Sequence, residues 1–410
     1  MLHRVVITGV GTVNPTGLTV DESWDNITNG RTGIGPIATF DNTDYLVRVA
    51  GEVKNFDPAR YMDAREVRRR DRFQQFATAA SQEALAQSGL VINDENAHRI
   101  GVVVSSSIGG VHAFQEAVQT IMTTGPRRVN PFTIPMLMPN GASGLIAIDN
   151  GARGPNFSVS SACASANDGM GQAWLLVASG TVDAVITGGS DATICEVGVA
   201  AFDRMGAMTH RTDGVPQPFD KERDGVVMGE GCGILIMETL EHARARGAVI
   251  LAEFAGYSAT GDAFHITAPA PDGVMGSRAM LQAMSAAGIN PDDLNYISAH
   301  GTGTPLNDAG ETKAVKVALG ERAYHVPISS TKSMTGHMMG ATGAVEAVFC
   351  VQAIRTNVVP PTINYRTPDP ECDLDYVPNT ARETPVRAVI SNAFGFGGHT
   401  AVAAFKQFVG

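Results

Sequence analysis

The sequence carries the same succession of strand-like and helix-like segments twice. Residues 5–13 (VVITGVGTV) and residues 251–262 (LAEFAGYSATGD) each read as a strand that leads into a glycine-containing turn. Each is followed by a helix-like segment, another strand and a second helix before a closing strand. A chain that repeats one plan in this way is expected to fold as an α/β protein of two pseudo-duplicated halves, and the alternation favours a largely parallel sheet.

The join between the halves is predicted near residues 240–248, which assigns residues 1–245 to the N-terminal half and 246–410 to the C-terminal half. Helical spacing of apolar residues predicts helices over residues 72–89, 277–288 and 343–355. Glycine-rich turns lie at residues 108–110, 225–233 and 395–398. These turns fall where strands should end, and functional sites of α/β sheets gather at such ends.

Composition excludes several classes of protein. The 410-residue chain has 44% hydrophobic and 17% charged residues, a composition that predicts a globular protein with a well-filled core. No charge-free apolar run reaches the roughly 18–20 residues of a membrane span, and the N-terminus lacks a signal-peptide pattern, so we expect a cytoplasmic protein without membrane association. The net charge of −11 argues against nucleic-acid binding. Five cysteines without a CxxC pair predict neither a disulfide framework nor a metal site.

Cys163 is the first candidate for a reactive side chain. It lies in VSSACASAND (residues 159–168), between Ala162 and Ala164 and directly ahead of a helix-like segment. The partial positive charge at a helix N-terminus lowers the pKa of a nearby thiol and favours the nucleophilic thiolate. The alternative is a buried, inert cysteine, and this stretch alone leaves both interpretations open.

Three later segments supply partners for that thiol. His300 ends a strand in ISAHGTGTPLNDAGE, and Lys332 and His337 lie five residues apart in SSTKSMTGHMMGATGA. The loop SNAFGFGGHT carries Phe394 and Phe396 among glycines. One cysteine, two histidines and one lysine at strand ends suggest acyl transfer to sulfur followed by carbanion chemistry.

These segments, taken in order, resemble one family from end to end. The chain is similar to the elongating β-ketoacyl-[acyl-carrier-protein] synthases, the condensing enzymes of the thiolase superfamily. The motifs that carry the resemblance are VITGVGTVNPTG, SACAS around Cys163, PFDKERDGVVMGEG at 218–231, AHGTGTPLND, KSMTGHMMGATGA and NAFGFGGH. The family implies a thiolase-like, five-layered αβαβα fold and a homodimer.

The resemblance also implies a reaction. Cys163 takes an acyl group from an acyl carrier protein, and a malonyl-loaded carrier then loses CO2 and extends the fatty acyl chain by two carbons. The Nε2 atoms of His300 and His337 hold the enolate oxygen, while the backbone N–H groups of Cys163 and Phe396 form the oxyanion hole. Since the phosphopantetheine arm of the carrier holds the substrate, no tightly bound cofactor is expected.

Supporting roles follow from the same resemblance. Lys332 is expected to pair with Glu311 and organise charge, with Asp308 as a second supporting carboxylate. Phe396 is expected to act as a gate, because glycines on both sides let its loop move. The implied substrate-binding residues are Thr302, Thr304, Ile108 and Phe394. An isoleucine at position 108 is typical of the second elongating type, which is associated with long acyl chains.

An acidic carrier would be repelled by a chain of net charge −11, so docking requires a local basic patch. Helical spacing places Arg65, Arg68, Arg69 and Arg72 on one stripe and points Arg70 elsewhere. This stripe is the predicted dock. The alternative is a solvated helix face that neighbouring acidic residues neutralise.

The chain departs from the family pattern at a few positions. Gly206 stands where many relatives carry an arginine that contacts the carrier, and His399 and Thr400 replace a Thr-Asn pair. Some relatives bind a structural monovalent cation near the positions of Glu346, Ser391 and Asn392. Ser298 replaces the usual asparagine ligand, so one ligand of that cation is missing from this sequence. A ketosynthase of a polyketide pathway uses the same Cys-His-His set and is the alternative function.

Overall fold

The computed structural model describes residues 2–211 and 213–410, and in these residues ten strands form one sheet. Five strands of the N-terminal half lie, from the outer edge inward, in the order β5 (Asn156–Phe157), β4 (Ile100–Ser105), β6 (Ala184–Asp191), β7 (Gly231–Thr239) and β1 (Val5–Val13). Five strands of the C-terminal half follow the order β10 (Ile328–Ser329), β9 (Tyr296–Ser298), β13 (Ala388–Gly395), β14 (His399–Lys406) and β8 (Ala252–Gly261).

The two sets of strands repeat one topology. If the five sheet strands of each half are numbered in chain order, their order in the sheet, from the outer edge inward, is 3-2-4-5-1 in both halves. The outer pairings β5–β4 and β4–β6 are parallel, as are β10–β9 and β9–β13. The predicted pseudo-duplication is therefore confirmed, while the division at residues 245/246 stays a prediction.

The prediction of a largely parallel sheet is wrong. β7 runs antiparallel to both β6 and β1, and β14 runs antiparallel to both β13 and β8. β13 and β14 are joined by a turn of only a few residues, and a connection this short forces an antiparallel pair. The halves meet where β1 pairs antiparallel with β8.

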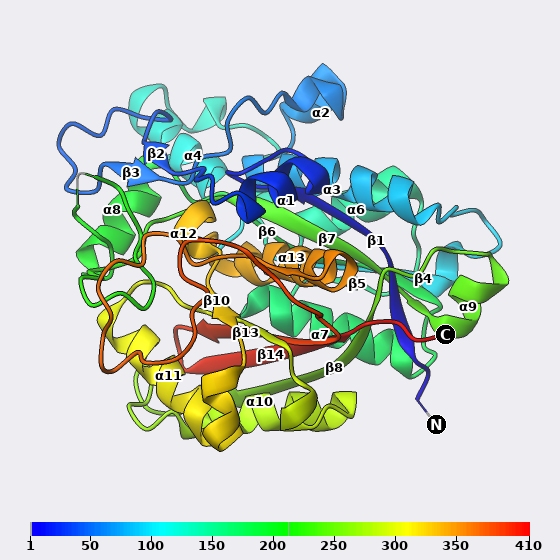
Figure 1. Cartoon of the computed structure of the whole chain (residues 1–410). Coiled ribbons are helices and arrows are strands. Elements are labelled where there is room, and N and C mark those ends of the chain that lie inside the picture. Colours follow the sequence, from blue (N-terminus) through cyan, green and yellow to red (C-terminus); the bar gives the residue numbers. More distant parts are fainter. Residues whose placement is uncertain (1, 212) are drawn as a thin grey trace.

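Helices cover both faces of each half-sheet and give five layers (Figure 1). The outer layer of the N-terminal half contains α3 (Arg72–Ser88) and α6 (Gly141–Asn150), and that of the C-terminal half contains α10 (Val274–Ala287) and α11 (Pro305–Leu319). The middle layer contains α7 (Ser165–Ala178) and α13 (Thr342–Thr356), which contact strands of both halves. α13 is buried nearly all round, as a helix between two sheets must be.

Glycines in β1 let a helix lie directly on the sheet. A Cβ atom added at Gly9 would lie 2.2 Å from the carbonyl oxygen of Ala84, and one at Gly11 would lie 2.1 Å from that of Ala80. Both carbonyls belong to α3, so the GVG segment of the first strand is required by this close approach.

The three helices predicted from apolar spacing are confirmed as α3, α10 and α13, with small differences at their ends. α3 begins after the N-cap Asp71 and ends at Ser88, before the C-cap Gly89, which has a φ of +62°. None of the helices in the described residues combines the length and the apolar character that a membrane crossing requires.

Candidate active site

Cys163 sits on a tight turn between β5 and α7. Ala162, directly before it, has a φ of +52°, a conformation that residues with a Cβ rarely adopt. The N–H of Ala164 donates to the carbonyl of Ser161 (3.1 Å), and that of Ser165 donates to the carbonyl of Ala162 (3.1 Å). The turn holds the side chain at the start of α7, where the sequence placed it, and leaves it 8% exposed.

Burial dominates the electrostatics of this thiol. It raises the pKa of Cys163 to about 12, and the nearby carboxylate of Asp191 also raises it. The charge of Lys332 and the N–H groups of Phe396 and Cys163 act in the opposite direction but do not outweigh burial. The prediction that the helix terminus favours a resting thiolate is therefore wrong, because desolvation of the sulfur is the larger effect.

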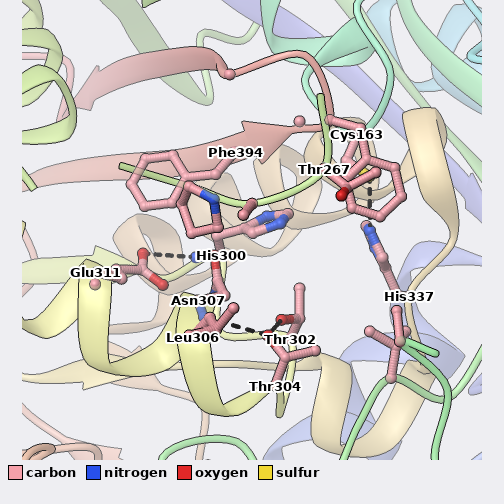
Figure 2. Close-up of a pocket in the computed structure, with 18 of the residues that line it drawn as sticks. Cys163, Thr267, His300, Thr302, Thr304, Leu306, Asn307, Glu311, His337 and Phe394 are labelled. Carbon is pink, nitrogen blue, oxygen red and sulfur yellow. Dashed lines mark hydrogen bonds between the residues drawn. The ribbon is translucent and has the colours of Figure 1, made fainter. Parts of the chain in front are cut away.

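His337 is the histidine in contact with the sulfur (Figure 2). Its Nε2 lies 3.0 Å from Sγ of Cys163, and its Nδ1 lies 3.0 Å from Oγ1 of Thr342. Burial, followed by the charge of Lys332, lowers the pKa of His337 to about 3. The imidazole is therefore neutral at neutral pH and can serve as a hydrogen-bond donor without carrying a charge.

His300 follows the end of β9 and lies beside His337. The two rings are 5.4 Å apart between centroids and nearly perpendicular, and the ring of Phe394 lies 5.7 Å from His300. Burial, with the charge of Lys332 second, lowers the pKa of His300 well below its usual value. Two neutral imidazoles thus face one space next to the sulfur.

The carboxylates of α11 fix the turn that carries His300. Glu311 accepts the N–H of His300 (2.8 Å) and of Gly301 (2.7 Å), and Asp308 accepts that of Gly303 (3.2 Å). Glu311 also accepts from Nδ2 of Asn392 (3.0 Å). Asp308 ends the motif AHGTGTPLND, and Glu311 follows one helical turn later, so both carboxylates come from the first two turns of α11.

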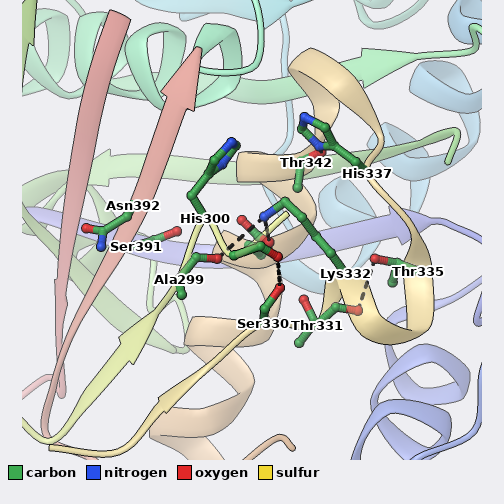
Figure 3. Close-up of polar contacts among 12 residues, drawn as sticks. Ala299, His300, Ser330, Thr331, Lys332, Thr335, His337, Thr342, Ser391 and Asn392 are labelled. Carbon is green, nitrogen blue, oxygen red and sulfur yellow. Dashed lines mark hydrogen bonds and ion pairs between the residues drawn. The ribbon is translucent and has the colours of Figure 1, made fainter. Parts of the chain in front are cut away.

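The predicted pairing of Lys332 with Glu311 is wrong. Nζ of Lys332 lies 2.6 Å from Oε1 of Glu346, on α13, and 3.4 Å from the carbonyl oxygen of Ala299. Glu311 is engaged by backbone N–H groups, which occupy its oxygen atoms. Figure 3 shows the lysine extended between the two histidines, so its charge acts on both rings and on the sulfur.

The loop after β13 packs against the cysteine turn. A Cβ atom at Gly395 would lie 2.6 Å from the carbonyl oxygen of Ser161, so only a glycine allows this approach. The loop brings the N–H of Phe396 to the sulfur of Cys163, as an oxyanion hole requires. The ring of Phe396 is half-buried, and its action as a gate stays a prediction.

One cavity of about 470 Å³ joins these groups (Figure 2). Of the predicted residues, its lining contains Cys163, His300, His337, Thr302, Thr304, Glu311, Phe394 and Phe396. Thr267, Leu306 and Asn307 also line it, and sequence reasoning missed them. Leu306 and Asn307 belong to the quoted motif AHGTGTPLND, which was the available signal.

Ile108 lies elsewhere, in the turn between β4 and α4 (Val111–Thr123), and is 39% exposed. It is not among the described residues that line the cavity, so its place in an acyl pocket stays a prediction.

Asp191 holds the turn between β4 and α4 by accepting hydrogen bonds from Oγ of Ser106 (2.5 Å) and from N–H of Ser107 (3.0 Å). It also accepts from N–H of Gly340 (2.8 Å).

The arginine stripe does not exist as one helix face. The cluster is divided between α2 (Ala64–Val67) and α3, which begins at Arg72 after the Asp71 cap. Arg72 forms an ion pair with the buried Glu230 (Nη2 to Oε1, 2.6 Å), and Arg69 forms one with Glu66 (Nη1 to Oε1, 3.4 Å). Arg65 and Arg68 are exposed, and so are Arg127 and Arg128, which the sequence analysis did not include. Nδ2 of Asn130 contacts the Arg68 carbonyl (3.4 Å) and so brings the 126–130 segment beside Arg68.

No group of three or more His, Cys, Asp or Glu side chains in residues 2–211 and 213–410 is arranged to hold a metal ion. Three buried oxygen atoms on α13 and β13 nevertheless have no hydrogen-bond partner among the described residues: Oε2 of Glu346, Oγ of Ser391 and Oδ1 of Asn392. Oxygen ligands of this kind suit a hard cation.

Family models match most of the chain. The model described as "Beta-ketoacyl synthase, N-terminal domain" matches residues 2–243, and "Beta-ketoacyl synthase, C-terminal domain" matches residues 251–366. The 3-oxoacyl-[acyl-carrier-protein] synthase 2 of Staphylococcus aureus is 50% identical over 407 residues, 99% of this chain and 98% of the relative. The protein of the same name from Synechocystis sp. is 49% identical over 408 residues, with the same coverage.

Solved structures agree with this similarity. The ishigamide ketosynthase/chain length factor has a TM-score of 0.93 and 36% identity, and each chain is fully covered. A type II polyketide ketosynthase bound to its acyl-carrier protein has a TM-score of 0.92 and 35% identity, again over the whole of both chains.

Proposed function

Because this chain belongs to the beta-ketoacyl synthase family, we propose that it is a 3-oxoacyl-[acyl-carrier-protein] synthase of the second elongating type. The observation that carries the proposal is the meeting, in one cavity, of a thiol and two neutral imidazoles, with Nε2 of His337 3.0 Å from Sγ of Cys163. The substrates are an acyl group and a malonyl group, each carried by an acyl carrier protein.

In the first step the sulfur of Cys163 attacks the thioester carbonyl of the acyl-carrier. A bond forms between Sγ and the carbonyl carbon, the bond to the pantetheine sulfur breaks, and the thiol proton leaves with the released pantetheine. The N–H groups of Cys163 and Phe396 stabilise the charge on the carbonyl oxygen during this exchange. Because the thiol is protonated at rest, its deprotonation must accompany the attack.

In the second step malonyl-carrier loses CO2 and leaves an enolate. Nε2 of His300 and Nε2 of His337 donate hydrogen bonds to the enolate oxygen. For His337 this requires Nε2 to carry the proton, which Thr342 permits by donating its hydroxyl to Nδ1. The carbanion then attacks the acyl-Cys163 thioester, and the cysteine thiolate is expelled as the leaving group. The 3-oxoacyl product is two carbons longer than the starting acyl chain.

Thr302 and Thr304 lie on the same side of the cavity and contact each other through their hydroxyl groups (3.1 Å). We assign them to the phosphopantetheine arm, whose amides and hydroxyl need polar partners in an otherwise apolar passage. Phe394 contributes an apolar wall next to His300.

The test is an assay of the purified protein with acyl-carriers of increasing chain length plus malonyl-carrier. We expect CO2 release, acylated Cys163 by mass spectrometry and 3-oxoacyl products. The alternative, a ketosynthase of a polyketide pathway, is supported by the similarity to polyketide ketosynthases. Repeated extension of an unreduced 3-oxoacyl chain would favour that alternative, and a single extension per acyl chain would favour fatty-acid synthesis.

Carrier docking is assigned to the exposed arginines Arg65, Arg68, Arg127 and Arg128 in place of the predicted stripe. Reversing Arg68 and Arg127 to glutamate should raise KM for the carrier substrate several-fold at low salt, because exposed charges act mainly on encounter. The turnover of a small thioester mimic should not change, and the effect should shrink with added salt. Arg31→Glu, at an exposed arginine paired with Asp25, is the matched control. An unchanged KM for the carrier would contradict this dock.

We also propose the homodimer that the family implies. Apolar side chains of α4 are exposed at helical spacing, and Phe114 (50%), Val118 (44%) and Met122 (81%) lie among them. A monomer rarely leaves such a stripe to solvent. Sedimentation velocity should give twice the mass of 43.0 kDa, and a Val118→Asp variant should dissociate. A monomeric parent protein would contradict the dimer.

A structural monovalent cation is a separate proposal. Glu346, Ser391 and Asn392 would hold it through the oxygen atoms that lack partners, and the ion would supply positive charge beside the Glu346 carboxylate. Potassium chloride should then raise Tm relative to N-methylglucamine chloride at equal ionic strength. Equal Tm values in the two salts would contradict it.

A further inference from the structure

A carboxylate outside the groups described so far touches the nucleophile turn. Asp168, in the first turn of α7, accepts a hydrogen bond from the hydroxyl of Ser161, two residues before Cys163. Its other oxygen accepts from the hydroxyl of Tyr257 on β8 (2.5 Å). Burial raises the pKa of Tyr257, so the phenol keeps its proton and donates. Asp168 therefore connects the cysteine turn to a strand of the other half.

The turn that Asp168 holds is strained. Ala162 has a φ of +52°, and a residue with a Cβ stays in this conformation only where its surroundings hold it there. Ser165 supplies part of that restraint, since its hydroxyl donates to the Ala162 carbonyl (2.6 Å) and accepts the N–H of Ser161 (2.9 Å). Backbone bonds from Ala164 and Ser165 add to it, and the contact from Asp168 to the Ser161 side chain supplies a further restraint.

The tyrosine ring also touches the strands that carry the oxyanion loop. It packs with the buried cluster of Ala164, Ala393 and Ala401, and Ala393 precedes Phe394 on β13. A Cβ atom at Gly171 would lie 2.5 Å from the ring, so the tyrosine can pack against α7 only because residue 171 has no side chain. One side chain thus contacts the residue after Cys163 and the strand that delivers the N–H of Phe396.

We propose that Asp168 and Tyr257 are positioning residues, which hold the sulfur of Cys163 in line with the oxyanion N–H group supplied by the other half. This inference rests on the proposed function, because it concerns the acyl-transfer step. Neither residue lines the cavity, and neither touches the reacting atoms. The histidines stand on different loops, so the two residues bear on acyl transfer and leave decarboxylation alone.

The test compares two partial reactions in Tyr257→Phe, Asp168→Ala and Asp168→Asn. Formation of acyl-Cys163 from an acyl-carrier is followed by mass spectrometry in a single turnover, and CO2 release is followed with malonyl-carrier alone. Small misplacements of a reacting group cost up to ~100-fold in rate. We expect acylation to fall roughly tenfold or more in Asp168→Ala and several-fold in Tyr257→Phe, with CO2 release within about twofold of the parent.

Two further variants separate positioning from general destabilisation. Asp168→Asn keeps one acceptor oxygen and should recover part of the acylation rate that Asp168→Ala loses. Tyr376→Phe removes another buried hydroxyl, which contacts Oγ1 of Thr312 at 2.8 Å, and should leave acylation unchanged. If Asp168→Ala does not fold, the comparison of acylation with CO2 release in Tyr257→Phe, which removes a single oxygen atom, tests the inference.

Equal loss of acylation and CO2 release in Tyr257→Phe, or no loss of acylation, would overturn the inference. Either result leaves the proposed function standing, provided that the parent protein forms acyl-Cys163. A parent protein that forms no acyl-Cys163 would overturn the proposed function and this inference together.

Discussion

The buried ion pair between Lys332 and Glu346 makes a quantitative prediction. The two side chains are 2% and 1% exposed, and their charged atoms are 2.6 Å apart. At an effective dielectric constant of ~20, two unit charges at this distance attract by about 6 kcal/mol, and desolvation of both groups offsets much of that. Removing one partner leaves a buried charge alone, so we expect Lys332→Met to cost roughly 3–5 kcal/mol in the free energy of unfolding.

A double-mutant cycle measures the pair itself. Glu346→Gln alone should cost a similar amount, and Lys332→Met/Glu346→Gln together should cost about as much as either single change. The coupling energy is then roughly 3–5 kcal/mol, obtained from urea unfolding at pH 8, because burial raises the pKa of Glu346 to about 7 and the pair must be charged. The matched control is Glu311→Gln, which removes charge from another buried carboxylate of the site. Its effect should add to that of Lys332→Met, because the two residues do not pair.

The same lysine has a functional readout. Its charge lowers the pKa of Cys163, so its removal should slow alkylation of the thiol by iodoacetamide at pH 8. Additive effects of Lys332→Met and Glu346→Gln, or a strong coupling of Lys332 with Glu311, would refute the pairing derived from the structure. Unchanged alkylation in Lys332→Met would refute the charge effect on the sulfur.

Three shorter predictions concern the reacting groups. Cys163→Ser should abolish acyl transfer, because no base is matched to a serine hydroxyl, and an acylated serine found by mass spectrometry at the parent's rate would contradict this. CO2 release should stay flat from about pH 8 to pH 5, because the lowered pKa values of His300 and His337 (about 3 for His337) keep both rings neutral, and a decline that begins near pH 6.5 in a folded sample would contradict it. Gly395→Ala should lower acyl transfer at least tenfold because its Cβ would lie 2.6 Å from the carbonyl oxygen of Ser161, and normal single-turnover acylation would contradict this.

Much of the candidate site could be predicted because its residues lie in contiguous motifs at strand ends. Cys163, His300 and His337 each follow a strand that the local sequence indicates, and the parallel pair of β9 and β10 brings His300 and His337 to the same end of the sheet. The partner of Lys332 could not be predicted in this way. Glu311 on α11 and Glu346 on α13 are both buried, and only the packing of α13 between the two half-sheets decides which one reaches the lysine.

The arginine cluster shows where a periodicity argument fails. Arg65, Arg68, Arg69 and Arg72 have helical spacing, but the segment contains a helix start that the spacing ignores. Asp71 accepts the N–H of Phe73 and forms a capping box with Gln74. An Asp followed three residues later by Gln is itself a helix-start signal. This signal separates the helix predicted over residues 72–89 from the residues before it, and it therefore removes Arg72 from the stripe.

The internal repeat explains why the reacting groups meet. Cys163 follows β5, the third strand of the first half, and His337 follows β10, the third strand of the second half, so the two residues occupy corresponding places in the repeated topology. The halves are joined through β1 and β8, and the middle layer of α7 and α13 keeps both motifs facing each other. A site divided in this way depends on contacts across the division. The bond from Tyr257 to Asp168 is such a contact, and a Tyr257→Phe variant that keeps its Tm but loses acylation would show that alignment of the halves, beyond their stability, governs the nucleophile.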